Sequence, residues 1–261
     1  MNIHLPFLPE RTEKPRETGL TMMMDKGLSI RETECFIETA GDFTDFVKIA
    51  FGTGIFAKNI EHKIQLYQQA GIQVYFGGTM FEAFIVRNQF NEFRQFLDKH
   101  QLNTVEVSDG SMTIPHDKKL EYIQILSVQA TVLSEVGSKI QGVVIEPEVW
   151  VSHMKSELEA GAWKVIAEAR ESGTIGIYHS DGSANKPLIK SLDREIGHDR
   201  ILWEAPNKNQ QVWFIQQFGA NVNLGNVPNV EVVALESLRL GLRGDTFFNF
   251  LPDELQHLKQ L

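Results

Sequence analysis

Five charged residues stand inside apolar segments of this 261-residue chain, where charges are not expected. They are Lys48, Glu106, Glu135, Glu168 and Glu204. A buried charge without a partner costs several kcal/mol, so these residues need opposite charges, a metal ion or a ligand. Four carboxylates without His or Cys suit a hard cation such as Mg²⁺, which binds through one or two carboxylates and substrate oxygens. All four glutamates are therefore candidate Mg²⁺ ligands, and the sequence does not choose among them.

Further polar residues and glycines stand within or directly after apolar segments of the same kind. The candidate site residues among them are Asp25, Lys26, Gly78, Thr79, Ser108, Lys139, Arg170, Ser172, Asn223, Gly225 and Asn226. The chain has a net charge of −9, so its scarce cations must gather at one place to bind an anion. The lysines and the arginine of this set therefore favour an anionic substrate. Taken alone, Gly77-Gly78 and Asn223 are more simply explained as turn formers.

Eight short apolar segments have the length and composition of β-strands. They span 19–25, 45–51, 72–78, 104–110, 131–137, 164–170, 200–206 and 221–227. Segments with helical spacing follow them, for example 60–71, which ends at a glycine as many helices do. Strands that alternate with helices predict parallel βαβ units, and eight units predict a closed (β/α)₈ TIM barrel. An open doubly wound sheet is the alternative, but no GxGxxG motif follows the first segment.

The alternation of side chains along a strand indicates where the five charges point. Lys48 shares a face with Phe46 and Ala50, whereas Val47 and Ile49 face the other way. Helices cover the outside of a parallel barrel, so a charge on that side would be buried against apolar side chains. We therefore expect the five charges to point into the barrel or to its carboxyl-terminal mouth, where barrel chemistry takes place. A purely structural network of ion pairs inside the barrel is the alternative.

Composition bounds the domain organisation and excludes several functions. With 42% hydrophobic and 23% charged residues the chain is typical of a globular domain. We expect an N-terminal arm at 1–18, a catalytic barrel domain at 19–250 and a tail at 251–261 that contains a short closing helix. No basic stripe and no run of about 18 apolar residues occurs, so nucleic acid and membranes are not expected as partners. The single Cys35 and a charged, proline-broken N-terminus favour the cytoplasm.

The strand ends also resemble those of a known family. In chain order the segments are DKG (25–27), DFVK (45–48), FGT (51–53), GGTMFE (77–82), EVSDG (106–110), SEVGSK (134–139), EARESG (168–173), WEAPNKNQQ (203–211), NVNLGN (221–226) and LESLRLGLRGDTF (235–247). Together they resemble the phosphosulfolactate synthase family, which also includes plant heat-stress-associated relatives. The resemblance implies a TIM barrel, Mg²⁺ dependence, a homo-oligomer and a lyase that adds sulfite to phosphoenolpyruvate, giving (2R)-2-phospho-3-sulfolactate. That reaction opens coenzyme M synthesis in archaea and serves sulfolactate formation in some bacteria.

The resemblance also implies a proton donor. Lys139 falls on the position expected for it, although Ser138 stands where archaeal members carry another lysine, and AFGTG at 50–54 replaces their GWGTS. The candidate catalytic residues are Lys139, Lys48, Lys26 and Asp25. Another Mg²⁺-dependent lyase or isomerase of small phosphorylated acids and a non-catalytic, stress-associated protein are the alternative functions.

Sulfite and phosphate repel each other, so holding both requires several binding groups. Lys26, Lys48 and Arg170 are the cations expected to hold them. The backbone from Asn223 through Gly225 to Asn226 resembles the phosphate-binding segment that often follows the last barrel strands. Arg239 and Arg243 are four residues apart and lie on one face of a predicted helix. Arg239 is expected in surface salt bridges, and Arg243 is expected at the site or at an oligomer contact.

Overall fold

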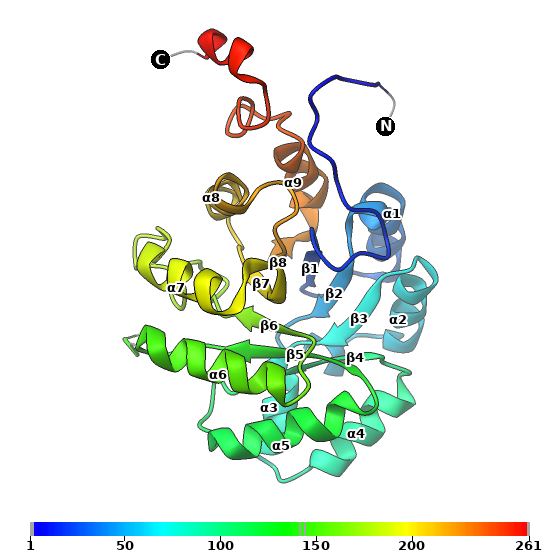
Figure 1. Ribbon diagram of the computed structural model, residues 1–261. Coiled ribbons are helices and arrows are strands. Elements are labelled where there is room, and N and C mark those ends of the chain that lie inside the picture. The colour runs from blue at the N-terminus through cyan, green and yellow to red at the C-terminus, as the bar shows by residue number, and fades with distance from the viewer. Residues whose placement is uncertain (1–2, 141, 144, 260–261) are drawn as a thin grey trace.

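The computed structural model describes residues 3–140, 142–143 and 145–259. These residues form one sheet of parallel strands that is bent into a nearly closed barrel (Figure 1). The strands are β1 (Thr21–Asp25), β2 (Phe46–Ile49), β3 (Gln73–Phe76), β4 (Thr104–Val107), β5 (Thr131–Val136), β6 (Lys164–Ala167), β7 (Ile201–Glu204) and β8 (Leu224–Pro228). Each strand overlaps one of the eight predicted segments, so the predicted (β/α)₈ barrel is confirmed.

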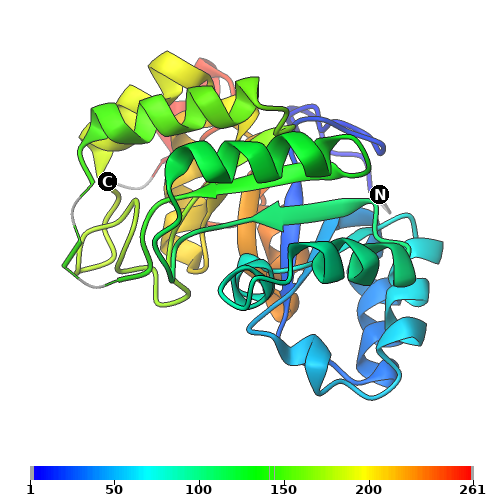
Figure 2. The ribbon, with the colours of Figure 1, turned by 90° about the horizontal axis from the view of Figure 1, so that it is seen from below.

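Helices flank the strands on the outside, as the view from below shows (Figure 2). They are α1 (Ile30–Ala40), α2 (Ile60–Gln69), α3 (Gly78–Ile85), α4 (Phe90–Lys99), α5 (His116–Ser127), α6 (Pro147–Glu159), α7 (Lys186–Ile196), α8 (Lys208–Phe218) and α9 (Val232–Arg239). Local sequence explains where they begin. At α1, for example, the side chain of Ser29 accepts from Glu32 N while the Glu32 carboxylate accepts from Ser29 N, a reciprocal cap. No helix among the described residues is long and apolar enough to cross a membrane.

The barrel has one seam without a strand ladder among the described residues. Hydrogen-bonded neighbours follow the order β3-β2-β1-β8-β7-β6-β5-β4, so β3 and β4 meet last. Side chains join them instead. Thr104 Oγ1 donates to Gln73 Oε1 at 2.6 Å where the two strands begin. Where they end, Gly78 N donates to a carboxylate oxygen of Glu106, so one of the inward glutamates helps to close the barrel.

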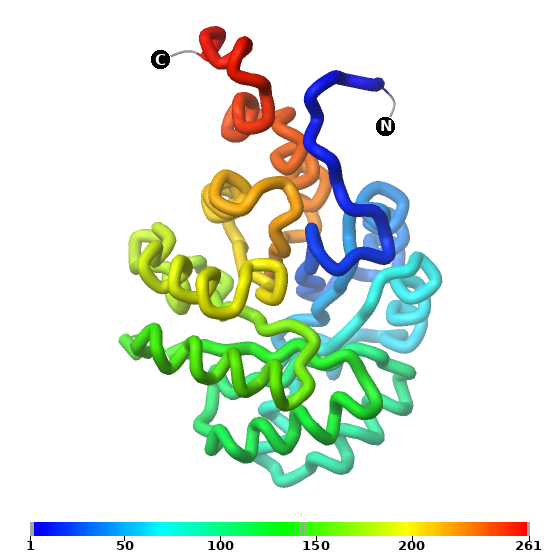
Figure 3. The backbone as a smooth tube through the Cα atoms, in the orientation of Figure 1, coloured from blue at the N-terminus to red at the C-terminus, as the bar shows by residue number. Residues whose placement is uncertain are grey.

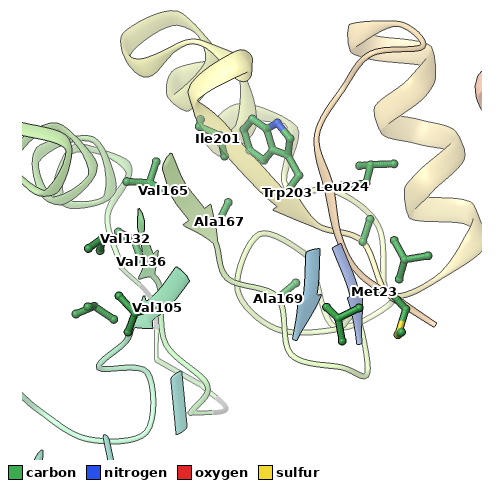
Figure 4. Close-up of a cluster of buried hydrophobic side chains, with 14 of the residues drawn as sticks. Met23, Val105, Val132, Val136, Val165, Ala167, Ala169, Ile201, Trp203 and Leu224 are labelled. Carbon is green, nitrogen blue, oxygen red and sulfur yellow. The ribbon is translucent and has the colours of Figure 1, made fainter. Parts of the chain in front are cut away.

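Two apolar layers result from the alternation of side chains along the strands. The barrel interior holds Leu20, Met22, Phe46, Tyr75, Leu133, Ile166 and Leu202. The opposite faces pack against the helices, and Figure 4 shows part of this layer, including Met23, Val165 and Trp203. Because these side chains fill the lower levels of the interior, the room for a ligand inside the barrel lies at its carboxyl-terminal mouth.

The N-terminal arm lies against the amino-terminal end of the barrel and runs past α9 (Figure 3). Arg11 Nε donates to Glu236 Oε1 at 2.8 Å and Arg11 Nη2 to the Gly19 carbonyl at 3.1 Å. Arg16 Nε donates to Asp45 Oδ1 at 2.8 Å, just before β2. A 3₁₀ helix at Asp253–Leu258 lies in the tail. Residues 1–2 of the predicted arm and 260–261 of the predicted tail lie outside the described residues.

The prediction that Arg239 is a surface residue is wrong. Its side chain is fully buried, with Nη1 donating to the carbonyls of Ala220 and Val222 at 2.7 Å each and Nη2 to that of Leu20 at 3.0 Å. The acceptors lie where β1 and β8 begin. A guanidinium offers five donors in a fixed plane, so one side chain can bind carbonyls of two strands at once. Arg239 therefore joins α9 to the barrel end.

Replacing Arg239 with methionine is expected to lower the free energy of unfolding by about 2–3 kcal/mol. The carbonyls of Ala220 and Leu20 keep a donor from Arg11 Nη1 and Leu224 N, so the loss falls mainly on that of Val222. A buried acceptor left unpaired costs about 1–3 kcal/mol. Urea denaturation followed by circular dichroism measures the change. The control is Arg243→Met, because Arg243 is half-buried and makes no side-chain hydrogen bond among the described residues. That variant is expected to stay within about 0.5 kcal/mol of wild type. Equal stabilities of the two variants would contradict the structural role of Arg239.

Candidate active site

The carboxyl ends of the strands surround a cavity of about 320 Å³. Each of the eight strands, or the segment that follows it, contributes to the lining. The charged residues that line it include Lys48, Glu135, Lys139, Glu168 and Glu204. A larger hollow of about 930 Å³ lies between the N-terminal arm and α9, and none of these five residues lines it. The convergence of charge, rather than size, therefore marks the smaller cavity as the candidate site.

Lys48 sits among three carboxylates inside the barrel. Its Nζ is 3.0 Å from Glu106 Oε2, 3.2 Å from Glu204 Oε1 and 3.5 Å from Glu135 Oε2. The fifth charge, Glu168, is buried and lines the same cavity. The prediction that all five strand charges point inward or to the mouth is confirmed. The alternative of an internal ion-pair network describes the same contacts, since Lys48 compensates the glutamates whether or not a ligand binds.

Lys139 is the second cation of this cluster and is closer to solvent. Its Nζ lies 2.6 Å from Glu135 Oε1 and 3.8 Å from Glu168 Oε2, and its side chain is 22% exposed. Below it, the Ser108 hydroxyl is 2.7 Å from Glu135 Oε1 and 3.3 Å from the lysine ammonium. Lys139 thus reaches the cavity from the segment after β5 and is held in place by carboxylates.

The pKa values of both lysines are raised. Burial alone would lower the pKa of Lys48, but the three surrounding carboxylates outweigh burial and raise it well above its usual value. Burial likewise opposes the charge of Lys139, and Glu135 followed by Glu168 outweighs it, so that its pKa is also raised. Both lysines are therefore positively charged at neutral pH.

The glutamates differ in how they ionise. Burial opposes the charged form of Glu135, but the adjacent Lys139 and Lys48 outweigh it and lower the pKa of Glu135 below its usual range. Burial, followed by the repulsion of Glu135, raises the pKa of Glu168 well above its usual value. Burial also raises the pKa of Glu204 to about 7, against the opposing effect of Lys48. Glu135 is therefore the most readily ionised of the three, and Glu168 and Glu204 hold a proton more tightly than an ordinary glutamate does.

Three of the four predicted metal ligands fit a cation. Glu135, Glu168 and Glu204 each offer a carboxylate oxygen, and these oxygens lie within 4.8 Å of one another. Oε2 of Glu135 and Oε2 of Glu168 are buried and accept no hydrogen bond from the described residues. A ligand set that consists only of oxygen atoms suits Mg²⁺. Glu106 lies outside this group of three and does not line the cavity.

Asp25 does not reach the cavity, contrary to the prediction that it is catalytic. Met22 and Met24 take the inward positions of β1, since Met22 packs in the interior and Met24 lines the cavity. Asp25 consequently faces the helix layer, where it accepts from Lys63 Nζ at 2.9 Å and Tyr67 OH at 3.1 Å. It joins β1 to α2.

Two of the three residues expected to cradle phosphate also lie elsewhere. Asn223 precedes β8, so it lies at the opposite end of the barrel, where its amide donates to the Asp199 carbonyl at 3.0 Å and its oxygen accepts from Leu20 N at 3.2 Å. Gly225 belongs to the interior, where a Cβ would meet Met22 Cε at 2.7 Å. Of the three residues, Asn226 is the one that lines the cavity.

The other predicted residues divide between the cavity rim and positions away from it. Gly78, Thr79 and Arg170 line the cavity. Lys26 is paired with Glu171 at the rim, and Glu171 lines the cavity too. The remaining three are Ser108, beneath the lining, Ser172, whose hydroxyl is 2.8 Å from that of Thr174, and Arg243, which does not line the cavity.

Comparison with known proteins identifies the family. The family model of (2R)-phospho-3-sulfolactate synthase (ComA) matches residues 9–245. Phosphosulfolactate synthase of Bacillus subtilis (strain 168) is 41% identical over 244 residues, which cover 92% of this chain and 97% of the relative. The chain belongs to the phosphosulfolactate synthase family. Its relative in Methanothermobacter thermautotrophicus, also a phosphosulfolactate synthase, is 38% identical over 252 residues, covering 94% of this chain and 98% of the relative.

A solved structure supports the fold. The barrel of this phosphosulfolactate synthase family member is similar to 3-hexulose-6-phosphate synthase from Salmonella typhimurium, with a TM-score of 0.56 at 13% sequence identity. The match covers 86% of this chain and 100% of that one. At this identity the likeness concerns the barrel alone, whereas the family relationship shows that the chain is an enzyme.

Two buried residues of this family member were missing from the predicted site. Glu82 on α3 is 4% exposed, and its Oε1 lies 2.6 Å from the Ser108 hydroxyl below Lys139. Lys119 on α5 is 1% exposed and donates to the Glu135 carbonyl at 2.6 Å. A signal existed for each: Glu82 is the only charged residue of an apolar helix, and Lys119 shares a helix face with Ile123 and Leu126.

Proposed function

We propose that the chain catalyses the Mg²⁺-dependent addition of sulfite to phosphoenolpyruvate, which forms (2R)-2-phospho-3-sulfolactate. The observation that carries the proposal is the cluster of Lys48, Lys139 and three glutamates at the mouth of a barrel of the phosphosulfolactate synthase family. Carboxylates suit the metal, and a charged lysine suits a reaction that ends with protonation of carbon. By analogy with the family we also propose that the protein acts as a homo-oligomer in the cytoplasm.

In the proposed reaction the sulfur of sulfite forms a bond to the methylene carbon of phosphoenolpyruvate. The electron pair of the double bond then moves to the neighbouring carbon and into the carboxylate. Lys139 Nζ delivers a proton to that carbon as general acid, which leaves the phosphate ester intact. The position of Lys139 supports this role, because it is the lysine held by Glu135 at the edge of the cavity.

The substrate anions need cations and donors that are free to bind them. Arg170 and Thr79, near the start of α3, line the cavity, and backbone N–H groups at a helix start favour anions. The N–H of Gly78 is already bonded to Glu106. Lys26 reaches the rim, where it now pairs with Glu171. We assign sulfite and phosphate to these groups. Lys48 is left to neutralise the buried glutamates, because three carboxylates already surround it.

Glu135, Glu168 and Glu204 would hold the metal. Bound Mg²⁺ would supply Lewis-acid stabilisation of the charge that develops on the substrate carboxylate. Lys48 would keep the glutamates from repelling one another before the cation binds. Thr79 and Arg170, which also line the cavity, would orient the substrate.

The decisive experiment is an anaerobic assay of purified protein with sulfite and phosphoenolpyruvate, followed by ³¹P NMR and mass spectrometry. We expect a product with the mass of phosphosulfolactate that retains the phosphate ester. No product from these two substrates, with turnover of another phosphorylated acid in a substrate panel, would favour a different lyase or isomerase. No turnover of any substrate by folded protein would favour a non-catalytic role.

Removal of the metal gives a separate prediction. EDTA in excess over Mg²⁺ is expected to abolish product formation, and added Mg²⁺ is expected to restore it. The control is far-ultraviolet circular dichroism in the same chelator, which is expected to be unchanged because the lysines still compensate the glutamates. Full activity in EDTA would exclude the metal from the mechanism.

A further inference from the structure

Helices α5 and α6 lie side by side outside the barrel (Figure 1), and they carry a second group of side chains that could hold a metal ion. His116 is the first residue of α5, and His153 and Glu157 are one turn apart on α6. Each residue offers one atom within 4.8 Å of the others. The two imidazole rings stack with centroids 3.9 Å apart and 12° between their planes. None of the three lines the cavity at the strand ends.

Hydrogen bonding permits the tautomer of His116 that a metal site needs. Ser156 Oγ is 2.8 Å from His116 Nε2, and it is also within reach of the carbonyls of Ser152 at 2.9 Å and His153 at 3.0 Å. When the hydroxyl donates its one hydrogen to a carbonyl, it can accept from His116 Nε2. In this tautomer Nδ1 of His116 has an unshared lone pair.

This lone pair faces a carboxylate oxygen. His116 Nδ1 is 3.8 Å from Oε1 of Glu157, whose side chain is fully buried. Nδ1 of His116 is buried and has no hydrogen-bond partner among the described residues, whereas Oε1 of Glu157 has Lys119 Nζ at 2.9 Å. Oε2 of Glu157 accepts from Ser134 Oγ at 2.6 Å, which fixes the orientation of the carboxylate. In this tautomer the Nδ1 lone pair faces the carboxylate, and a cation bound by both would stabilise the arrangement.

A proton on a histidine is a poor candidate for that cation. Burial, followed by the charge of Lys119, lowers the pKa of His116. Burial, followed by His116 itself, lowers the pKa of His153. Both rings are therefore neutral at neutral pH, and the neutral imidazole is the form that binds metal ions.

The nearby Lys119 pairs with the same carboxylate but has other partners. Its Nζ is 2.9 Å from Glu157 Oε1. It also donates to Asp109 Oδ1 at 2.9 Å and to the Glu135 carbonyl at 2.6 Å. Lys119 thus keeps two strong partners if Glu157 Oε1 turns to another cation.

We propose that His116, His153 and Glu157 form a binding site for Zn²⁺ or a similar first-row transition-metal ion. Two imidazoles and one carboxylate are an established zinc ligand set, with bonds of about 2.0–2.2 Å, so ligand atoms of a tetrahedral site lie about 3.3 Å apart. The three atoms lie within 4.8 Å of one another, and one imidazole turns out of the stack when both lone pairs point at the ion. Imidazole ligands select against Mg²⁺, so this site is distinct from the glutamates of the barrel mouth. A bound ion would link α5 to α6.

The test is a titration of chelator-treated, full-length protein with Zn²⁺, and with Co²⁺ for visible absorption, in buffer containing excess Mg²⁺. His153→Ala and His116→Ala are each expected to weaken binding at this site at least about tenfold, since losing even a partner outside the ligand set costs 10–100-fold. The Co²⁺ absorption bands should weaken in parallel. Circular dichroism checks that each variant is folded.

The matched control is His62→Ala, because His62 is an exposed histidine on α2. It is expected to bind one Zn²⁺ per chain with wild-type affinity at the α5–α6 site. The proposal is overturned if wild type and both cluster variants bind the same number of Zn²⁺ ions with equal affinity, or if wild type binds none. Because the readout is metal binding, the result does not depend on catalytic activity.

Discussion

Lys139→Ala is expected to lower the turnover of sulfite and phosphoenolpyruvate by about 10²–10⁴-fold, the usual effect of losing a general acid. The Lys139 ammonium lies 2.6 Å from Glu135 Oε1 and its side chain is 22% exposed, so it is held in place and still reaches the cavity. Its raised pKa keeps it protonated at neutral pH, as a proton donor must be. The loss should appear in kcat, with substrate binding much less affected.

Two further variants make this result specific. Lys139→Met keeps the aliphatic stem but removes the charge, and it is expected to lose as much activity as the alanine variant. Lys190→Ala removes an exposed lysine of α7 and is expected to retain wild-type turnover. Wild-type turnover by either Lys139 variant would show that Lys139 is not the acid. Lys26 and Lys48 would then be the next candidates.

Lys48→Met is expected to lower the free energy of unfolding by about 3–5 kcal/mol, the usual effect of breaking a buried ion pair from one side. Lys48 lies within 3.5 Å of carboxylate oxygens from Glu106, Glu135 and Glu204, and all four side chains are buried. Without the ammonium, the carboxylates repel one another in a medium that solvates them poorly. Urea denaturation at pH 7 measures the difference.

The pH dependence of the Lys48→Met variant follows from the same charges. Burial already raises the pKa values of Glu106 and Glu204, and loss of Lys48 raises them further. A carboxyl whose folded-state pKa exceeds its unfolded value loses stability as pH rises through that interval. The deficit relative to wild type should therefore shrink as pH falls toward about 4, near the unfolded value for glutamate.

A second substitution tests whether charge is the cause. Lys48→Met combined with Glu106→Gln is expected to recover part of the lost stability, because the amide oxygen can still accept from Gly78 N without a charge. The single variant Glu106→Gln is the reference. If the double variant is as unstable as the sum of the two single changes, charge compensation is not the role of Lys48.

The sequence by itself determined the eight strands and the face on which their charges lie. Lys48 stands between Val47 and Ile49, and Glu106 between Val105 and Val107, so apolar neighbours identify the outward face. The alternation of side chains is a local property of an extended backbone, which makes it readable from a few residues. The same alternation does not distinguish the two faces of β1, because TMMMD has methionines on both of them. The structure shows that Asp25 points outward.

The tertiary structure decided at which end of the barrel each side chain lies and which residues it contacts. Asn223 and Asn226 are three residues apart, yet one bonds to backbone at the amino-terminal end of the barrel and the other lines the cavity. That difference depends on where β8 begins, which its ladders with β1 and β7 set. Likewise, the burial of Arg239 and the meeting of His116 with Glu157 arise from contacts between distant segments. Such contacts depend on how helices pack against strands, which the spacing of residues within one element does not encode.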